Sequence, residues 1–208
     1  PRPRPTRCSS NPPTATASTR RRACSTNWAP PCSGWLHAGA SPWCLCSPWA
    51  VHRSVLHAIG LLKSQGVVPA SLKVFLDSPM AVSTTGLFQH HMQEHRLSGR
   101  EVQALEHGAT MVQTTEQSKG LARLHGPMVI LSASGMATGG RVLHHLALHA
   151  GDHRNMIILT GHQAPGTRGA RLAEGEKNIR IHGQDVAVRA EVVKLSSASA
   201  HADGNQLI

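Results

Sequence analysis

The chain has 208 residues, of which 40% are hydrophobic, so it is long enough for one or two domains with a hydrophobic core. Of its formal charge of +10, six units come from arginines within residues 1–50, and the modest excess of +4 in the rest suits a groove for a polyanion such as a nucleic acid without demonstrating one. The sequence has no apolar run of membrane-spanning length and no recognisable signal peptide, so we expect a cytoplasmic protein that does not bind membranes.

Composition changes abruptly near residue 50. All five cysteines, all four tryptophans and nine of the 13 prolines come before this point, whereas every aspartate and glutamate follows it. Residues 1–50 show no helical or strand periodicity, and both a basic arm for nucleic acid and a disordered tail are open interpretations. The odd number of cysteines and the lone Cys44-x-Cys46 pair argue against a disulfide framework or a zinc site there.

Helical and strand patterns alternate over residues 51–160. Short apolar runs predict strands at 73–76, 128–131 and 155–160. Apolar spacing or capping residues predict helices over 55–62, from Ser78-Pro79 toward His95, from capping boxes at 98–101 and 114–117, and over 140–149. This order predicts an α/β fold with a parallel sheet flanked by helices, whose ligands bind at the carboxyl ends of the strands.

The pattern changes after Gly161. Gly166–Gly169 is predicted to be a loop and Asn178–Ile181 a short strand. Val186–Val192 alternates with the period of a half-exposed strand. We therefore expect a region richer in β-structure toward the end of the chain.

The strongest candidate for ligand binding is the segment 132–141, with the sequence SASGMATGGR, which we call the Ser/Gly loop. A loop of small residues between a strand and a helix leaves backbone N–H groups that can hold an anion such as phosphate. A tight turn that needs glycine is the alternative. We expect phosphate contacts from hydroxyl and backbone groups of Ser132, Ser134, Gly135, Thr138, Gly139 and Gly140.

Three further positions carry open alternatives. Arg168 can clamp a phosphate through two parallel hydrogen bonds, or it can be a surface arginine that closes a loop. His182 either lines a cleft or packs in the core. Asp77 follows a strand as a metal ligand would, but the sequence Asp-Ser-Pro favours a role in a helix cap.

The histidines form two clusters at helical spacing. Their sequences are His90-His91-x-x-x-His95 and His144-His145-x-x-x-His149, and neither carries the glutamate of the HExxH metal motif. We therefore predict exposed polar helix faces rather than metal sites.

The order of five motifs resembles that of the β-CASP branch of the metallo-β-lactamase superfamily, a group of zinc-dependent nucleases. These motifs are Val74–Ala81, the Ser/Gly loop, Gly166–Gly169, Ile181–Gly183 and Ser199–Asp203, and the resemblance covers roughly residues 50–208. It implies a β-CASP cap domain over 51–160. Over 161–208 it implies partial β-strands of a metallo-β-lactamase core and the start of an incomplete C-terminal region for RNA specificity.

The resemblance also offers an explanation of residues 1–50. In a shifted reading frame, the codons of Ser10–Ala17 permit Glu-Ser-Thr-Tyr-Gly-Asp-Arg, and those of Pro42–Val51 permit Val-Val-Pro-Val-Phe-Ala-Val-Gly-Arg. Both strings resemble segments of β-CASP proteins. We interpret most of this segment as an out-of-frame translation, with the frame recovered near Ala50–Ser54.

The resemblance also assigns the catalytic residues. Ser199–Asp203 is similar to the family's motif B, whose histidine lies beside two zinc ions, so His201 is expected to protonate the departing RNA oxygen. Asp203 either orients that ring or caps a following helix. The family's dinuclear site needs a His-x-His-x-Asp-His string that this sequence lacks. Two zinc ions are therefore expected in the intact parent and none in this chain.

These observations predict a zinc-dependent hydrolase that cleaves RNA phosphodiester bonds, present here as a truncated and inactive fragment. RNA is the expected partner, and a homodimer of the intact parent stays open. The alternative is a non-catalytic RNA-binding module that uses the same Ser/Gly loop. An unrelated nucleotide-binding domain is disfavoured, because the sequence has neither a P-loop nor a strand-linked Gly-x-Gly-x-x-Gly.

Overall fold

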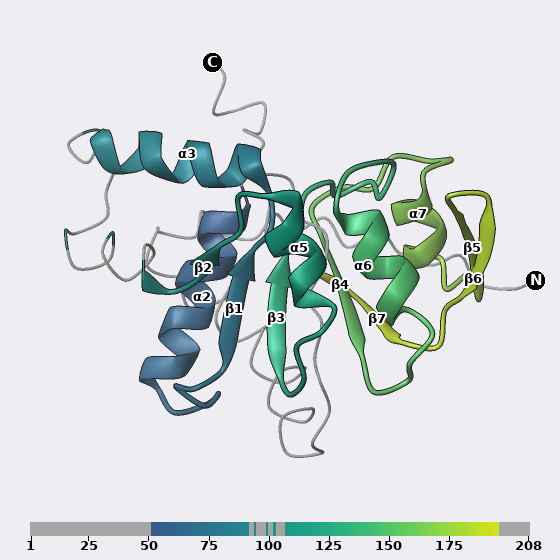
Figure 1. Cartoon of the computed structure of the whole chain (residues 1–208), viewed down its shortest axis with the longest axis horizontal. Helices are drawn as coiled ribbons and strands as arrows, with labels where there is room; N and C mark the ends of the chain where they lie inside the picture. Colours follow the sequence, from purple (N-terminus) through teal and green to yellow (C-terminus); the bar gives the residue numbers. More distant parts are fainter. Residues whose placement is uncertain (1–50, 92–93, 95–98, 100–101, 103–106, 196–208) are drawn as a thin grey trace, which may run out of the picture.

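The computed structural model describes residues 51–91, 94, 99, 102 and 107–195 (Figure 1). The helices in these residues are α2 (His52–Ser64), α3 (Pro79–His90), α5 (Thr115–Leu121), α6 (Val142–His149) and α7 (Arg168–Ala173). The strands are β1 (Lys73–Leu76), β2 (Thr110–Met111), β3 (Met128–Leu131), β4 (Met156–Thr160), β5 (Asn178–Ile181), β6 (Gln184–Ala187) and β7 (Glu191–Leu195). Residues 1–50, three of the four residues of the capping box predicted at 98–101 (98, 100 and 101), and His201 with Asp203 lie outside the described residues.

Capping residues explain where two of the helices begin. The Ser78 hydroxyl accepts a hydrogen bond from the Ala81 N–H at 3.3 Å, and Pro79 is the first residue of α3. At α5, Thr114 and Gln117 form a complete capping box. Both helix starts are therefore confirmed, although α3 ends at His90.

Strands β1 to β4 all pair in parallel with their neighbours, as predicted. Strands β2, β1 and β3 make one parallel sheet in that order, with Phe75 of β1 opposite Ile130 of β3. Strand β7 pairs in parallel with β4, while β5 and β6 form an antiparallel hairpin. The carboxyl ends of β1 and β3 therefore lie side by side, where Asp77 and the Ser/Gly loop begin.

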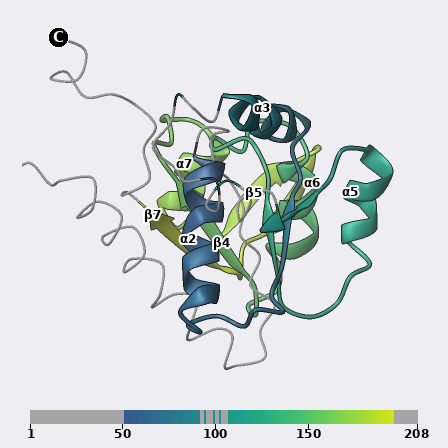
Figure 2. The ribbon, with the colours of Figure 1, turned by 90° about the vertical axis from the view of Figure 1, so that its left-hand side faces the viewer.

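Helices cover both faces of the parallel strands, so side chains on each face are buried. On one face, α2 packs against side chains from β1, β3 and β4, which are Val74, Leu76, Val129, Leu131, Met156 and Ile158. On the other face, Leu121 of α5 packs against Phe75, Met128 and Ile130. Figure 2 shows α2 and α5 on opposite sides of these strands. Helices α6 and α7 cover the corresponding face of β4 through Leu146, Leu172 and Leu159.

Two sequence predictions after Gly161 are wrong. The single strand predicted over Val186–Val192 is divided between β6 and β7. The N–H groups of Arg189 and Ala190 both donate to the Ala150 carbonyl, so the chain leaves the hairpin there and crosses to β4. The loop predicted at Gly166–Gly169 instead contains the start of α7, because the Thr167 hydroxyl accepts from the Ala170 N–H and caps this helix.

None of the helices within the described residues combines the length and the apolar character that a membrane span requires.

Candidate phosphate-binding loop and the buried network beneath it

The Ser/Gly loop leaves the carboxyl end of β3 and leads into α6. The Asp77 N–H donates to the Leu131 carbonyl at 2.7 Å, which extends the pairing of β1 and β3 by one residue. The Ser132 hydroxyl is buried and donates to the Asp77 carbonyl at 3.0 Å. Any phosphate contact from Ser132 is therefore left to its backbone.

Helix α7 fixes the middle of the loop by a close approach of two backbones. The Gly169 N–H donates to the Met136 carbonyl at 2.8 Å. A Cβ atom at Gly169 would lie only 2.8 Å from the Gly135 carbonyl oxygen. Only glycine fits at this position without a shift of the backbone.

Arg168 lies beside the loop and binds its carbonyl groups. The Nη1 atom of Arg168 is 3.4 Å from the carbonyl oxygens of both Ala137 and Thr138, and its Nε donates to the carbonyl of Arg180 in β5. Ala137 is buried and has a φ of 49°, in the left-handed region that non-glycine residues rarely adopt. The guanidinium therefore stabilises a strained part of the loop, and its contact with phosphate stays a prediction.

The end of the loop presents donors without acceptors. Thr138 and Gly140 are exposed and Gly139 is half-buried. Within the described part of the chain, their backbone N–H groups donate to no protein acceptor, and the hydroxyls of Ser134 and Thr138 are equally free. Consecutive free amides just before a helix can hold an anion where they point partial positive charge toward one place.

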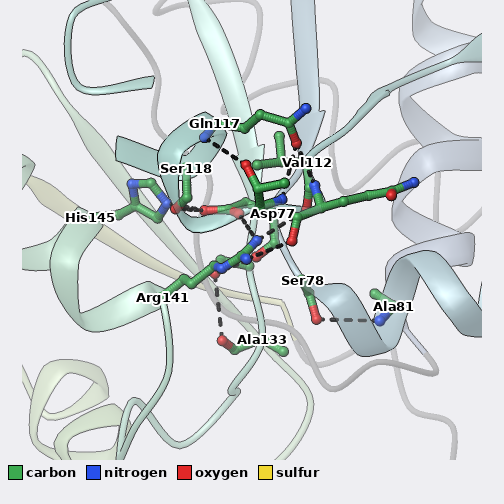
Figure 3. A network of polar contacts seen from close by, with 12 residues as sticks. Asp77, Ser78, Ala81, Val112, Gln117, Ser118, Ala133, Arg141 and His145 are labelled. Atoms are coloured by element: carbon green, nitrogen blue, oxygen red, sulfur yellow. Dashed lines mark hydrogen bonds and ion pairs between the residues drawn. The ribbon is translucent and has the colours of Figure 1, made fainter. Parts of the chain in front are cut away.

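A buried polar network lies beneath the loop and centres on Asp77 (Figure 3). The Oδ2 atom of Asp77 accepts hydrogen bonds from the Ser118 hydroxyl and from the Nε2–H of His145, both at 2.6 Å. The Oδ1 atom accepts from Nη1 of Arg141 at 2.8 Å. These contacts tie the end of β1 to α5 and to the first turn of α6.

The network determines the charge on Asp77. Burial by itself raises the pKa of this carboxyl group. Hydrogen bonds from His145, Ser118 and Arg141 outweigh burial, so the net effect lowers the pKa below its usual value. Asp77 is therefore ionised at neutral pH.

Two sequence predictions fail at this network. The cap of α3 is provided by Ser78, while the Asp77 carboxylate points into the network and makes no cap contact. His145 was predicted on an exposed face, but its side chain is only 3% exposed. Arg141 and His145 are four residues apart, so they lie on the same helix face. This spacing of two basic side chains is the sequence signal that could have indicated a shared buried acidic partner.

His182 is exposed and lies at the tight turn between β5 and β6, which places it at a cleft and outside the core. It has a φ of 49°, and the ring of His144 stacks on it with the centroids 4.9 Å apart. Both imidazoles line a cavity between α5 and α6. His144 is exposed, as predicted for this helix face.

The described residues contain no group of three or more histidine, cysteine, aspartate or glutamate side chains that could hold a metal ion. Buried His52, at the start of α2, has neither ring nitrogen in hydrogen-bond geometry. Burial lowers its pKa to about 4, and the nearby backbone of Ser132 offsets only part of this effect.

Comparison with known proteins places this architecture in a family. The Beta-Casp domain matches residues 53–172. Ribonuclease TTHA0252 of Thermus thermophilus is 39% identical over 142 residues, which are 65% of this chain and 33% of that protein. The RNase J-like protein of Methanocaldococcus jannaschii is 46% identical over 82 residues, 39% of this chain and 19% of that protein.

Integrator complex subunit 11 of Gallus gallus is 31% identical over 83 residues, 40% of this chain and 14% of that protein. The chain thus spans a third or less of the length of these curated relatives. The Beta-Casp match covers more than half of the chain and includes α2, β1, the Asp77 network and the Ser/Gly loop. The chain therefore belongs to the β-CASP family of metallo-β-lactamase-type ribonucleases.

Proposed function

We propose that the protein hydrolyses RNA phosphodiester bonds and that the Ser/Gly loop holds a phosphate of the RNA backbone. The observation that carries this proposal is the set of free donors at the end of the loop, the N–H groups of Thr138, Gly139 and Gly140. The names of the relatives support RNA as the substrate, since they include a ribonuclease and an RNase J-like protein.

Each residue of the loop has a distinct part in this proposal. The amides and the free hydroxyls of Ser134 and Thr138 bind the phosphate. Gly169 and Arg168 hold the loop in the shape that presents these groups, because both bind loop carbonyls. Such contacts position the strand without reading its sequence.

The chemical step is proposed for residues outside the described ranges. His201 protonates the departing oxygen, and Asp203 orients its ring. Zinc would supply an activated hydroxide in the whole protein. The described residues form no donor set for a metal. A whole protein that binds RNA without cleaving it would support the alternative of a non-catalytic RNA-binding module.

RNA binding by the chain tests the role of the loop. We expect the double variant Ser134→Ala, Thr138→Val to weaken binding of a short fluorescein-labelled single-stranded RNA by about 5- to 30-fold, because two solvent-accessible hydrogen bonds, each worth about 0.5–1 kcal/mol, are lost. Fluorescence anisotropy at low salt gives the Kd. The control is Ser83→Ala, an exposed hydroxyl on α3. An unchanged Kd in the double variant would show that the hydroxyls of Ser134 and Thr138 do not hold the strand.

A further inference from the structure

A cavity of about 560 Å³ lies in the groove between α5 and α6. Its lining includes Thr115 and Lys119 of α5, Gly140 and Arg141 before α6, and the stacked His144 and His182. This volume falls within the range of pockets that bind small molecules. Because Gly140 also belongs to the Ser/Gly loop, the cavity begins where the proposed phosphate site ends.

The charges around the cavity favour an anion. The lining contains Lys119 and Arg141 and no aspartate or glutamate. Arg141 is engaged by Asp77, whereas Lys119 is exposed and has no hydrogen-bond or ion-pair partner among the described residues. Lys119 is thus the cation that is available to a ligand.

The remaining lining favours a flat heterocycle. The rings of His144 and His182 lie 28° from parallel, and the neighbouring surface is formed by Ala122, Ala147 and the exposed Leu148. Histidine is among the side chains on which unstacked RNA bases pack. His145 also lines the cavity, and its Nδ1 has no hydrogen-bond partner in the described part of the chain.

We propose that this cavity binds one nucleotide of the RNA strand whose neighbouring phosphate the Ser/Gly loop holds. The base packs on the His144–His182 pair, and Lys119 attracts the phosphate of the bound nucleotide. This inference rests on the proposed function and assigns a second subsite to it. The subsite recognises a base by its flat face, so it does not select among sequences.

Two small probes separate the contributions of the base and the phosphate. We expect the chain to bind adenosine monophosphate about 5- to 100-fold more tightly than ribose 5-phosphate, because only the first carries a base to stack. Isothermal titration calorimetry measures both affinities. His182→Asn should remove this preference, since asparagine tolerates the left-handed turn and lacks the ring. His144→Ala, on the surface of α6, should do the same without touching the turn.

Lys119 should contribute to the affinity for both probes, because both carry a phosphate. Lys119→Ala should weaken both probes to a similar degree, and the controls Lys177→Ala and His125→Ala, at exposed positions away from the cavity lining, should weaken neither. Equal binding of the two probes, or a preference that survives both histidine variants, would overturn the nucleotide subsite.

The same variants, measured with the labelled RNA, separate the two proposals. If the loop variant weakens RNA binding and the histidine variants do not, the cavity inference fails and the loop proposal stands. If the histidine variants weaken RNA binding and the loop variant does not, the cavity binds RNA and the hydroxyl contacts proposed for the loop fail. Circular dichroism of each variant confirms that it has the same secondary structure as the unsubstituted chain.

Discussion

A single carboxylate, Asp77, holds the end of β1 against two helices. Its side chain is fully buried, and a buried charge is tolerated only when its hydrogen-bonding capacity is filled. Ser118, His145 and Arg141 fill it from α5 and α6. Removing the acid would leave the His145 Nε2–H and one N–H of Arg141 without their acceptor, although Arg141 would keep its bonds to the carbonyls of Val112 and Gln113.

We therefore expect Asp77→Ala to lower the free energy of unfolding by about 3–5 kcal/mol, the cost of breaking a buried charge pair. Urea unfolding at neutral pH measures this loss. The control is Asp152→Ala, which removes an exposed pair with Arg154 and should leave the unfolding midpoint almost unchanged. Similar small changes in both variants would contradict the importance of the network.

Because folding lowers the pKa of Asp77, the ionised carboxylate stabilises the folded state above about pH 4. This stabilisation is lost as pH falls through the pKa of Asp77 in the folded state.

His52 gives a second pH dependence at the residue scale. Burial lowers its pKa to about 4, so the folded state keeps this ring neutral while the unfolded chain protonates it below about pH 6.5. Above about pH 6.5, His52 therefore does not change the free energy of unfolding. Below that pH it destabilises the folded state, and increasingly so as pH falls toward the pKa of His52 in the folded state.

The variant His52→Leu should remove this loss. Within the described part of the chain neither ring nitrogen makes a hydrogen bond of good geometry, and the nearby Ser132 backbone offsets only part of the cost of burial, so an apolar side chain of similar size costs little at neutral pH. Relative to the unsubstituted chain, we expect a gain of about 2 kcal/mol on going from neutral pH to about pH 5. Urea unfolding across this range measures the gain. Parallel pH profiles for His52→Leu and the unsubstituted chain would refute the assignment.

At the scale of elements, the close contact between α7 and the Ser/Gly loop makes one glycine irreplaceable. A Cβ atom at Gly169 would lie 2.8 Å from the Gly135 carbonyl oxygen and 3.1 Å from the Met136 carbonyl carbon. Gly60, inside α2, has open space around the corresponding position. The same substitution should thus have opposite effects at the two sites.

We expect Gly169→Ala to destabilise the fold by about 1–3 kcal/mol, because the backbones must separate, and also to weaken RNA binding by displacing the loop. Gly60→Ala should stabilise the chain by about 0.5–1 kcal/mol through helix propensity. Thermal unfolding and the anisotropy assay measure the two properties. If Gly169→Ala destabilises the fold but leaves the RNA affinity unchanged, the contact between Gly169 and the Ser/Gly loop supports the fold and has no part in RNA binding.

Prediction of elements from the sequence succeeds where a local pattern is strong. Strands β1, β3 and β5 have the predicted bounds, because each is a short apolar or alternating run between polar residues. The short helix α7 was missed, since its six residues are too few for apolar periodicity and only the Thr167 cap marks it. The break after β6 depends on hydrogen bonds to Ala150, a contact that no local pattern reveals.

At the scale of the whole molecule, the α/β class and the position of the Ser/Gly loop follow from the order of the elements. Parallel strands place their carboxyl ends at one edge, so a loop after β3 must lie beside the end of β1. The Asp77–His145 contact could not be predicted in this way, because it joins residues 68 positions apart and depends on how α6 is rotated on the sheet. The stacking of His144 on His182 is equally a product of tertiary packing.

The central claim, that the Ser/Gly loop holds an RNA phosphate through its backbone, is tested most directly by NMR of the loop amides. The N–H groups of Thr138, Gly139 and Gly140 should shift downfield when the ¹⁵N-labelled chain is titrated with single-stranded RNA, because each gains a charged acceptor. Their shifts should saturate with the Kd obtained by anisotropy. Amide signals of these three residues that stay in place while the RNA binds would contradict the account.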